Sequence, residues 1–336
     1  MYYADKLDSL KDIFGSSDVH LGTNSLKVNG RVYPVIDDVI VLLDPAQYPP
    51  SLKRRIEGAG CQNGTVPDFA RDIQFTFGQE WQKYPDMLPE HKDEFELYFD
   101  IVDIARLRNM RVCDLGCGIG RWSYYLKDRC RELVLVDFSE AIFVARRNMK
   151  DSPGTLFFMG DLKRLPFKAG FADFLFCIGV LHHLPTNALT EVRNLKKYAP
   201  ALLIYLYYSL DNRPASYRLM LACVTAGRMV FSKVKSHSMR QCITFILAVC
   251  VYMPFVWIGS LFNLFGWGRY VPLYEGYNGK TLKRILQDVY DRFFTGIEQR
   301  VSRKQVMALR DTFKNIVVSE NLPYWHFLCT NDRTAL

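Results

Sequence analysis

The chain has 336 residues, of which 49% are hydrophobic and 23% are charged. These proportions are those of a soluble globular protein, and they exclude a disordered chain, a fibrous repeat and a disulfide-stabilised miniprotein. The net charge of +8 is confined to one block, because residues 210–310 hold 15 Lys and Arg against 5 Asp and Glu, which leaves −2 for the remainder. The nine cysteines form no C-x-x-C pair and the first ten residues have no apolar core, which predicts a cytoplasmic protein with free thiols.

Residues 1–50 are predicted to form a small β-rich module. The apolar runs 25–28 and 32–35 flank Asn29-Gly30, a strong hairpin signal, and a third apolar run covers 39–43. The segment GRVYPVID at 30–37 resembles a pattern of the Trm112 family, whose zinc-binding members carry cysteines. Residues 1–60 contain no cysteine, so this Trm112-like module is not expected to bind a metal. No metal site is predicted elsewhere either, since no His, Cys or carboxylate cluster has metal-ligand spacing.

Residues 51–75 are rich in Pro, Gly and polar residues and are predicted to be a linker. From residue 76 a helical pattern leads into alternating apolar strands and helices, which predicts a parallel sheet with helices on both faces. The expected strands cover 111–115, 133–136, 155–159, 171–178 and 201–208, and the expected helices cover 120–129, 139–150 and 186–198. A helix at 302–313 and strands at 315–318 and 325–330 close the domain. Residues 76–209 and 301–336 are therefore predicted to form one core, interrupted by an insert of residues 210–300.

A glycine-rich turn follows the first expected strand of this core. Residues 112–120 read VCDLGCGIG and closely resemble motif I of S-adenosylmethionine-dependent methyltransferases. A Rossmann oxidoreductase shares the G-x-G spacing, but the flanking D-L-G-C-G-x-G-R is typical of a methyltransferase. The resemblance implies an α/β fold, the Rossmann-like seven-stranded sheet of class I methyltransferases, with S-adenosyl-L-methionine as cofactor. It also implies that Asp114 accepts a hydrogen bond near the methionine ammonium.

Acidic residues also follow the next two expected strands. Asp137 ends the second strand, where a carboxylate can bind both ribose hydroxyls, and Gly-Asp-Leu at 160–162 resembles the adenine-amine contact of methyltransferases. A helix cap is the alternative role for a single acid of this kind, but three acids at successive strand ends lie at the edge where open α/β sheets bind ligands. The predicted cofactor-binding residues are Asp114, Gly116, Gly118, Gly120, Asp137, Phe138, Asp161, Leu162 and Gly179.

The fourth strand runs into CIGVLHHL at 177–184, which resembles a segment of the ubiquinone- and sterol-type methyltransferase superfamily. In that superfamily the segment lines the cofactor and faces the acceptor. His182 or His183 is therefore a candidate for accepting a proton from the acceptor or for positioning it. The alternatives are that one histidine only caps a helix and that positioning alone is sufficient for methyl transfer. Upstream, FGQEW at 77–81 resembles a box that precedes the core in some members, where an aromatic residue closes the site or simply packs in the core.

The insert contains a long apolar segment. Residues 242–266 carry no charged side chain, a length sufficient to span a bilayer, although Pro254 is expected to kink a helix there. A single crossing is excluded because residues 302–331 complete the same sheet. A hairpin made with an amphipathic helix at 214–232, flanked by Lys233, Lys235, Arg240 and Arg269, is expected to enter one leaflet, so that the protein is peripheral or monotopic at the cytoplasmic membrane face. The alternative is that the hairpin is an internal lid.

These features predict a methyltransferase that acts on a lipophilic or membrane-presented small molecule. Tyr205, Tyr274 and Phe294 are expected on the acceptor side of the site. One alternative is a tRNA or other macromolecule methyltransferase, suggested by the basic block and the N-terminal module. An RNA surface, however, is basic and polar, whereas this block is interleaved with apolar residues, so a nucleic-acid partner is not favoured. The other alternative, a catalytically inactive methyltransferase-like binding protein, is opposed by the intact glycine turn and the three acids.

Overall fold

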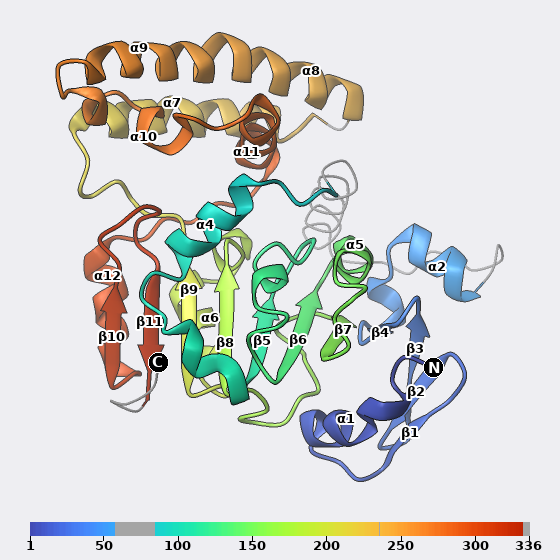
Figure 1. Cartoon of the computed structure of the whole chain (residues 1–336). Coiled ribbons are helices and arrows are strands. Elements are labelled where there is room, and N and C mark those ends of the chain that lie inside the picture. The colour runs from blue at the N-terminus through green and yellow to red at the C-terminus, as the bar shows by residue number, and fades with distance from the viewer. Residues whose placement is uncertain (58–84, 235, 332–336) are drawn as a thin grey trace. The chain divides into compact units, whose positions relative to one another are not determined.

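The computed structural model describes residues 1–57, 85–234 and 236–331, and the chain forms two compact units (Figure 1). The first unit comprises residues 1–207 and 303–336, and the second comprises residues 208–302. The second unit is thus a continuous insertion in the sequence of the first. Each unit has its own buried core.

Within the described residues, the first unit is built around one sheet of eleven strands, in the order β1-β2-β3-β4-β7-β6-β5-β8-β9-β11-β10. Its parallel centre consists of β4 (Val39–Val41), β7 (Thr155–Met159), β6 (Glu132–Asp137), β5 (Arg111–Leu115), β8 (Phe174–Ile178) and β9 (Ala201–Tyr205). The antiparallel strands are β1 (Val19–Leu21), β2 (Ser25–Val28), β3 (Arg31–Ile36), β10 (Asn315–Val318) and β11 (Phe327–Thr330). The seven strands from β7 to β10 are the Rossmann-like sheet of the class I methyltransferase fold, which confirms the predicted fold class. The predicted count of seven was too low by four strands.

The four additional strands are those of the N-terminal segment. The predicted hairpin is confirmed, since Val28 lies opposite Arg31 and both turn residues, Asn29 and Gly30, have positive φ angles of 49° and 80°. These are the angles of a two-residue hairpin turn, which Asn-Gly adopts readily. The next strand, β4, pairs in parallel with β7, with Val39 opposite Phe157. The N-terminal strands therefore extend the central sheet.

The helices of the first unit are short. They are η1 (Ala4–Lys6), α1 (Leu7–Phe14), η2 (Pro45–Gln47), α2 (Pro50–Glu57), α4 (Glu90–Tyr98), η3 (Ile104–Asn109), η4 (Ser123–Tyr125), α5 (Ala141–Asn148), η5 (Leu181–His183), α6 (Ala188–Leu195), α12 (Arg303–Met307) and η8 (Ala308–Asp311). The predicted helix at 120–129 is wrong, because only the single 3₁₀ turn η4 forms there. Tyr125, Leu126 and Arg129 each donate a backbone hydrogen bond three residues back, so the segment is a series of tight turns. The start of the predicted linker is helical in α2, and residues 58–75 of it lie outside the described part of the chain.

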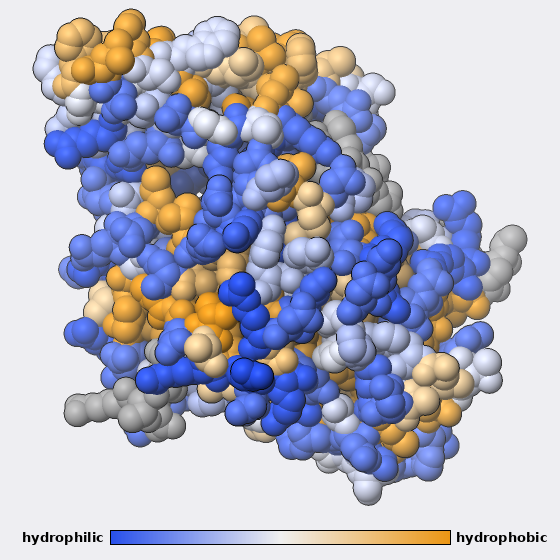
Figure 2. Space-filling view, viewed as in Figure 1, coloured by the Kyte–Doolittle hydropathy of each residue, from blue (hydrophilic) through white to orange (hydrophobic). Residues whose placement is uncertain are grey.

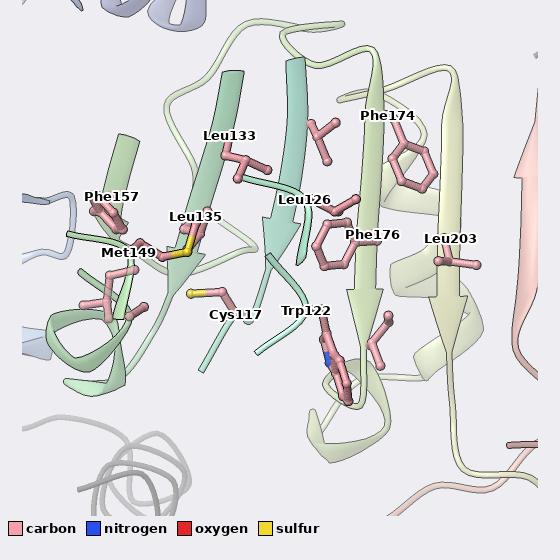
Figure 3. Packing of buried hydrophobic residues seen from close by; sticks show 14 of the residues in the cluster. Cys117, Trp122, Leu126, Leu133, Leu135, Met149, Phe157, Phe174, Phe176 and Leu203 are labelled. Atoms are coloured by element: carbon pink, nitrogen blue, oxygen red, sulfur yellow. The ribbon is translucent and has the colours of Figure 1, made fainter. Parts of the chain in front are cut away.

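Both faces of the sheet are covered. On one face, Phe157 and Phe176 pack with Phe95 of α4 and Ile142 of α5 in the main apolar cluster, part of which Figure 3 shows on neighbouring strands. Strand residues alternate between faces, and Phe158 meets Phe14 of α1 on the opposite face with ring centroids 6.3 Å apart. The central strands β5, β7 and β8 are buried along their whole length, which explains their nearly continuous apolar sequences.

The second unit is helical. It contains α7 (Ala215–Phe231), α8 (His237–Leu247), η6 (Ala248–Tyr252), α9 (Met253–Asn263), η7 (Gly268–Tyr270), α10 (Tyr274–Tyr277) and α11 (Leu282–Phe294). The segments α8, η6 and α9 form one continuous helix of 27 residues from His237 to Asn263. Pro254, at which a kink is expected, is the second residue of α9 and follows the π-helical segment η6, whose wider pattern accommodates a residue without an N–H.

Candidate active site

The glycine-rich turn lies where the strand order reverses, between β5 and β8. Gly116, Gly118 and Gly120 have φ angles of +78°, +54° and +78°, which only glycine adopts without strain. A Cβ added to Gly116 would lie 2.3 Å from Cγ2 of Val180, so the turn also approaches the end of β8 too closely for a larger residue. This reversal point is the position at which open α/β sheets bind ligands.

Asp114 is buried beneath this turn, next to the last residue of β5. Its side chain is 1% exposed, and Ser123 Oγ donates a hydrogen bond of 2.7 Å to Oδ2. The pKa of Asp114 is raised to about 8, because burial and, to a smaller extent, the charge of Asp137 raise it more than the Ser123 hydrogen bond lowers it. A buried carboxyl with this pKa ionises readily when a cation lies beside it.

Asp137 ends β6 and binds the glycine turn directly. Its Oδ2 accepts from the backbone N–H of Gly118 at 2.8 Å, and its Oδ1 accepts from the N–H and the hydroxyl of Ser139 at 2.8 and 2.7 Å. Burial raises the pKa of Asp137, while the hydrogen bonds from Ser139 and Gly118 act in the opposite direction. Each carboxylate oxygen has two acceptor positions, so these three contacts orient the group and leave one position, on Oδ2, for a hydroxyl donor. The next residue, Phe138, is partly buried against the main apolar cluster.

Asp161 and Leu162 follow β7 at the same edge. Oδ1 of Asp161 accepts from the backbone N–H of Lys163 at 3.0 Å, and Oδ2 lies 3.4 Å from Nε2 of Gln47. Gly160 N donates to the backbone oxygen of Asp137 at 2.8 Å, which ties the ends of β6 and β7 together. The three predicted acids therefore lie at the carboxyl ends of three neighbouring strands, in the spatial order β7, β6, β5.

The two histidines form the turn η5 after β8. Gly179, with φ +82°, allows the chain to turn there, and His182 and His183 are 0% and 3% exposed. The ring of His182 stacks on Tyr207 with centroids 4.0 Å apart and lies 4.1 Å from the ring of His183. Both imidazoles are thus held inside an aromatic environment at the carboxyl end of β8.

The three residues expected on the acceptor side are divided between the units. Tyr205 ends β9, and its ring centroid lies 6.5 Å from that of His182. Tyr274 and Phe294 belong to the second unit, where Phe294 is in the apolar core and Tyr274 packs closely on Gly259 of α9. Within that unit both side chains have a packing role. The FGQEW segment at 77–81 lies outside the described residues.

Several site residues were absent from the sequence-based set. Ser123 and Ser139 hydrogen-bond Asp114 and Asp137, and only the two-residue spacing of Ser139 from Asp137, that of a side-chain turn, was visible in the sequence. An aromatic series also lies near the histidines, in which Tyr98 is 5.0 Å from Trp122 and 5.1 Å from Tyr205 between ring centroids. These rings come from distant parts of the chain, so no local pattern predicts their meeting. Among residues 1–57, 85–234 and 236–331, no group of three His, Cys, Asp or Glu side chains could hold a metal ion.

Residues 112–198 match the family described as methyltransferase domain, a range that contains the glycine turn, the three acids and both histidines. No protein with a curated description matches the chain. Solved structures are similar in part.

Phosphoethanolamine N-methyltransferase 1 of Haemonchus contortus, solved with S-adenosylhomocysteine, is 19% identical to this chain. The similarity covers 43% of this chain and 34% of that protein, with a TM-score of 0.37. The PH0226 protein of Pyrococcus horikoshii is 24% identical over 38% of this chain and 64% of its own, with a TM-score of 0.33. Magnesium protoporphyrin IX methyltransferase of Synechocystis, solved with S-adenosylhomocysteine, is 16% identical over 82% of this chain and 90% of its own, with a TM-score of 0.37. The chain thus covers about a third of the first of these proteins and less than two thirds of the second.

The domain match and the geometry at the sheet edge point to the same part of the chain. Residues 112–198 match a methyltransferase domain, and they contain the glycine turn and the three acids at the carboxyl edge of the sheet. The fold assignment rests on the strand order and on this match, because all three TM-scores are below 0.5.

Proposed function

We propose that this chain, with its methyltransferase domain at 112–198, transfers a methyl group from S-adenosylmethionine to a lipophilic small molecule at a membrane surface. The observation that carries the proposal is the combination of a strand-tip cofactor site in the first unit with a long, exposed, uncharged helix face in the second. The first supports the reaction, and the second supports the kind of acceptor.

The residues at the sheet edge fit the cofactor. The left-handed glycine turn lets a ligand approach the backbone, and a buried carboxyl at Asp114 suits a methionine ammonium. Asp137, already oriented by Gly118 and Ser139, would accept from a ribose hydroxyl, and Asp161 would accept from the adenine amine. Leu162 and Phe138, beside these acids, would contact the adenosine.

S-adenosylmethionine supplies an electrophilic methyl group on a sulfonium, so the protein has to position the acceptor and, for some acceptors, remove a proton. Neutral imidazole accepts protons near physiological pH. His182 is held by its stack on Tyr207, and His183 lies beside it, so either ring would present a nitrogen in a fixed place. Aromatic rings around them exclude water, which strengthens electrostatic interactions at the reacting atoms.

The rings near His182 support an apolar acceptor. Tyr205, Tyr207 and Tyr98 offer broad apolar faces, with hydroxyl groups as their polar atoms. These rings favour an acceptor whose reacting end is largely uncharged. Tyr274 and Phe294 remain acceptor-side candidates from the second unit, and a role there requires movement away from their present packing.

The second unit exposes an uncharged helix face. Only 22% of the most apolar 18-residue stretch of the helix 237–263 is buried, and no charged residue occurs between Arg240 and Arg269. Figure 2 shows apolar side chains gathered over α8 and α9. The exposed apolar residues repeat at helical spacing and include Phe245, Ile246, Trp257, Ile258, Leu261, Leu264 and Phe265. A continuous apolar face of this length fits a helix lying in the plane of a lipid leaflet.

The charges near this face are fewer than the sequence suggested. Arg240 is 5% exposed, because it donates to the backbone oxygen of Val234 at 2.6 Å and lies over the ring of Phe294. Lys235 lies outside the described residues, so Lys233 and Arg269 are the exposed flanking charges in the described part of the insert. They are still suited to an anionic surface.

The basic block gives little support to an RNA substrate. Four of its arginines form ion pairs within the second unit and have side chains only 11–18% exposed. The pairs are Arg213–Glu275, Arg228–Glu298, Arg284–Asp288 and Arg300–Glu298. An RNA-binding surface requires exposed cations and stacking rings, so much of the basic excess serves the packing of the unit.

The test compares lipid extracts from cells with and without the protein by mass spectrometry, followed by incubation of the extract with purified enzyme and S-adenosylmethionine. We expect one lipid-soluble species to gain a single CH₂ unit in the presence of the enzyme. Methyl incorporation into RNA, with none into lipid-soluble molecules, would contradict the proposed acceptor. Failure of the protein to bind S-adenosylhomocysteine would contradict the proposed activity itself.

A further inference from the structure

The N-terminal segment reaches the carboxyl edge of the sheet because β4 pairs with β7. Val41 lies opposite Met159, and Leu42 N donates to the backbone oxygen of Met159 at 2.8 Å. The two strands are parallel, so the residues that follow Val41 run beside the residues that follow Met159. The turn after β4 is thereby brought to Gly160 and Asp161.

The side-chain amide of Gln47 is oriented by its own turn. Asp44 and Gln47 form a capping box around η2, in which Oε1 of Gln47 accepts from the backbone N–H of Asp44 at 3.2 Å. Since the amide oxygen faces a donor, the NH₂ group must be at the other position, where Nε2 lies 3.4 Å from Oδ2 of Asp161. The amide therefore donates to the carboxylate.

A second contact connects the same segment to the loop after β6. Ser51 Oγ donates to Oε2 of Glu140 at 2.6 Å, and Glu140 follows Asp137 by three residues. The segment is anchored between these contacts, because Tyr48 and Leu52 are 6% and 0% exposed in the main apolar cluster. One rigid stretch, residues 44–51, thus contacts the loops that follow both β6 and β7.

We infer that residues 44–51 are part of the cofactor site and that Gln47 is a positioning residue for recognition of a 6-aminopurine. The inference rests on the proposed function, in which Asp161 accepts from the adenine amine. Lys163 N fixes one carboxylate oxygen and Gln47 fixes the other, so the plane of the carboxylate is set before the base arrives. A fixed acceptor distinguishes an exocyclic amine, which donates, from a 6-oxo group, which does not.

The experiment measures base selectivity. Calorimetry gives the dissociation constants of S-adenosylhomocysteine and S-inosylhomocysteine, which differ in an amino and an oxo group on the base. Gln47→Met keeps the length of the side chain and removes the amide. We expect the preference of the variant for the adenine ligand to fall by about three- to tenfold, the effect of one ordinary hydrogen bond, because Gln47 acts on the base only through Asp161. Lys27→Met, at an exposed position in β2 of the same segment, is the matched control and should retain the preference.

The outcomes separate this inference from the proposed function. A merely structural role for Gln47 would weaken both ligands equally, and an unchanged preference in Gln47→Met would overturn the inference while leaving the cofactor assignment intact. Wild-type protein that binds neither ligand would overturn the proposed function and the inference with it. Gln47→Glu provides a second variant, because a like charge beside Asp161 should reduce the preference at least as far as Gln47→Met does.

Discussion

His326 is bound by Asp100 from the other end of the first unit, with Nε2 of the imidazole 2.6 Å from Oδ1 of the carboxylate. Nδ1 of the same ring lies 2.7 Å from the backbone oxygen of Pro323. The backbone oxygen of Pro323 can only accept a hydrogen bond, so Nδ1 donates to it, and Nε2 faces the carboxylate of Asp100. The contact ties the β10–β11 hairpin to the segment that follows α4.

Asp100→Asn should destabilise the protein at neutral pH. Burial raises the pKa of Asp100, but the hydrogen bonds from Asn321, His326 and Ser319 together lower it by more. The pKa of Asp100 is therefore below its ordinary value. A lowered carboxyl pKa contributes stability above the unfolded pKa and loses it as pH falls through the folded one. We expect about 1–3 kcal/mol lower free energy of unfolding at pH 7, with a difference that shrinks below about pH 4, by urea denaturation. Asp93→Asn, at an exposed position on α4, is the control. Equal losses of unfolding free energy in both variants would contradict a stabilising role for the Asp100 hydrogen bonds.

Asp137→Ala should remove the ribose contact. The carboxylate holds the glycine turn through Gly118 and would bind the ribose, so its loss should weaken S-adenosylhomocysteine binding by about ten- to a hundredfold. Calorimetry measures the dissociation constant, and Asp151→Ala, at an exposed position, is the control. Unchanged affinity in Asp137→Ala would show that the cofactor binds elsewhere.

Binding of S-adenosylhomocysteine should release a proton from Asp114 near neutral pH. Because its pKa is raised to about 8, Asp114 is largely protonated at pH 7, and the ligand ammonium favours its ionised form. The proton count follows from calorimetry in two buffers with different ionisation enthalpies. Asp114→Asn should bind without this release, and a wild-type protein that releases none would contradict the assignment.

The same raised pKa makes Asp114 a source of pH-dependent stability in the unliganded protein. The folded state holds a proton that the unfolded state releases between about pH 4 and 8, so the unfolding free energy falls as pH rises through this range. Asp114→Asn removes this contribution and should therefore show a flatter profile.

If a histidine is the base, His182→Ala or His183→Ala should lower turnover by about two orders of magnitude while the affinity for S-adenosylhomocysteine is kept. His182→Phe retains a ring against Tyr207 and separates packing from proton transfer. A rate assay with the identified acceptor gives turnover. Full turnover in both alanine variants would mean that positioning alone is sufficient.

The exposed face of α8 and α9 should bind anionic lipid. We expect wild-type protein to sediment with phosphatidylglycerol vesicles at low salt, and Ile246→Asp together with Trp257→Asp to release it, because both side chains are more than half exposed. The control pair, Val32→Asp with Leu97→Asp, adds two charges at exposed apolar positions of the first unit. Wild-type protein that stays in the supernatant would contradict the proposed binding of this face to a membrane.

The strand ends could be read from the sequence because each buried strand is a short apolar run that stops at a turn residue. Asp137 and Asp161 lie after such runs, where the structure also places them. The pairing of β4 with β7 could not be predicted in this way. It joins Val39 to Phe157 across more than 100 residues, and a short run of Val and Ile fits an edge hairpin as well as a central sheet.

The helix expected at 120–129 does not form, and the residues of the segment itself explain why. Its residues include Trp122, Ser123 and Tyr125, which have modest helix propensity, and the hydroxyl of Ser123 is used by Asp114. The ion pairs of the basic insert could not be predicted, because a sequence shows charges and not the groups that they contact. The buried position of Arg240 depends on Val234 and Phe294, the latter 54 residues further along the chain.

The insert begins and ends at neighbouring points. Tyr208 and Val301 form a parallel bridge, and Ser209 N donates to the backbone oxygen of Val301 at 2.9 Å. Strand β9, before the insert, pairs directly with β11, which follows it. A short loop could therefore replace the whole insert without separating β9 from β11, so evolution or an engineer can exchange the helical unit while the sheet is inherited unchanged.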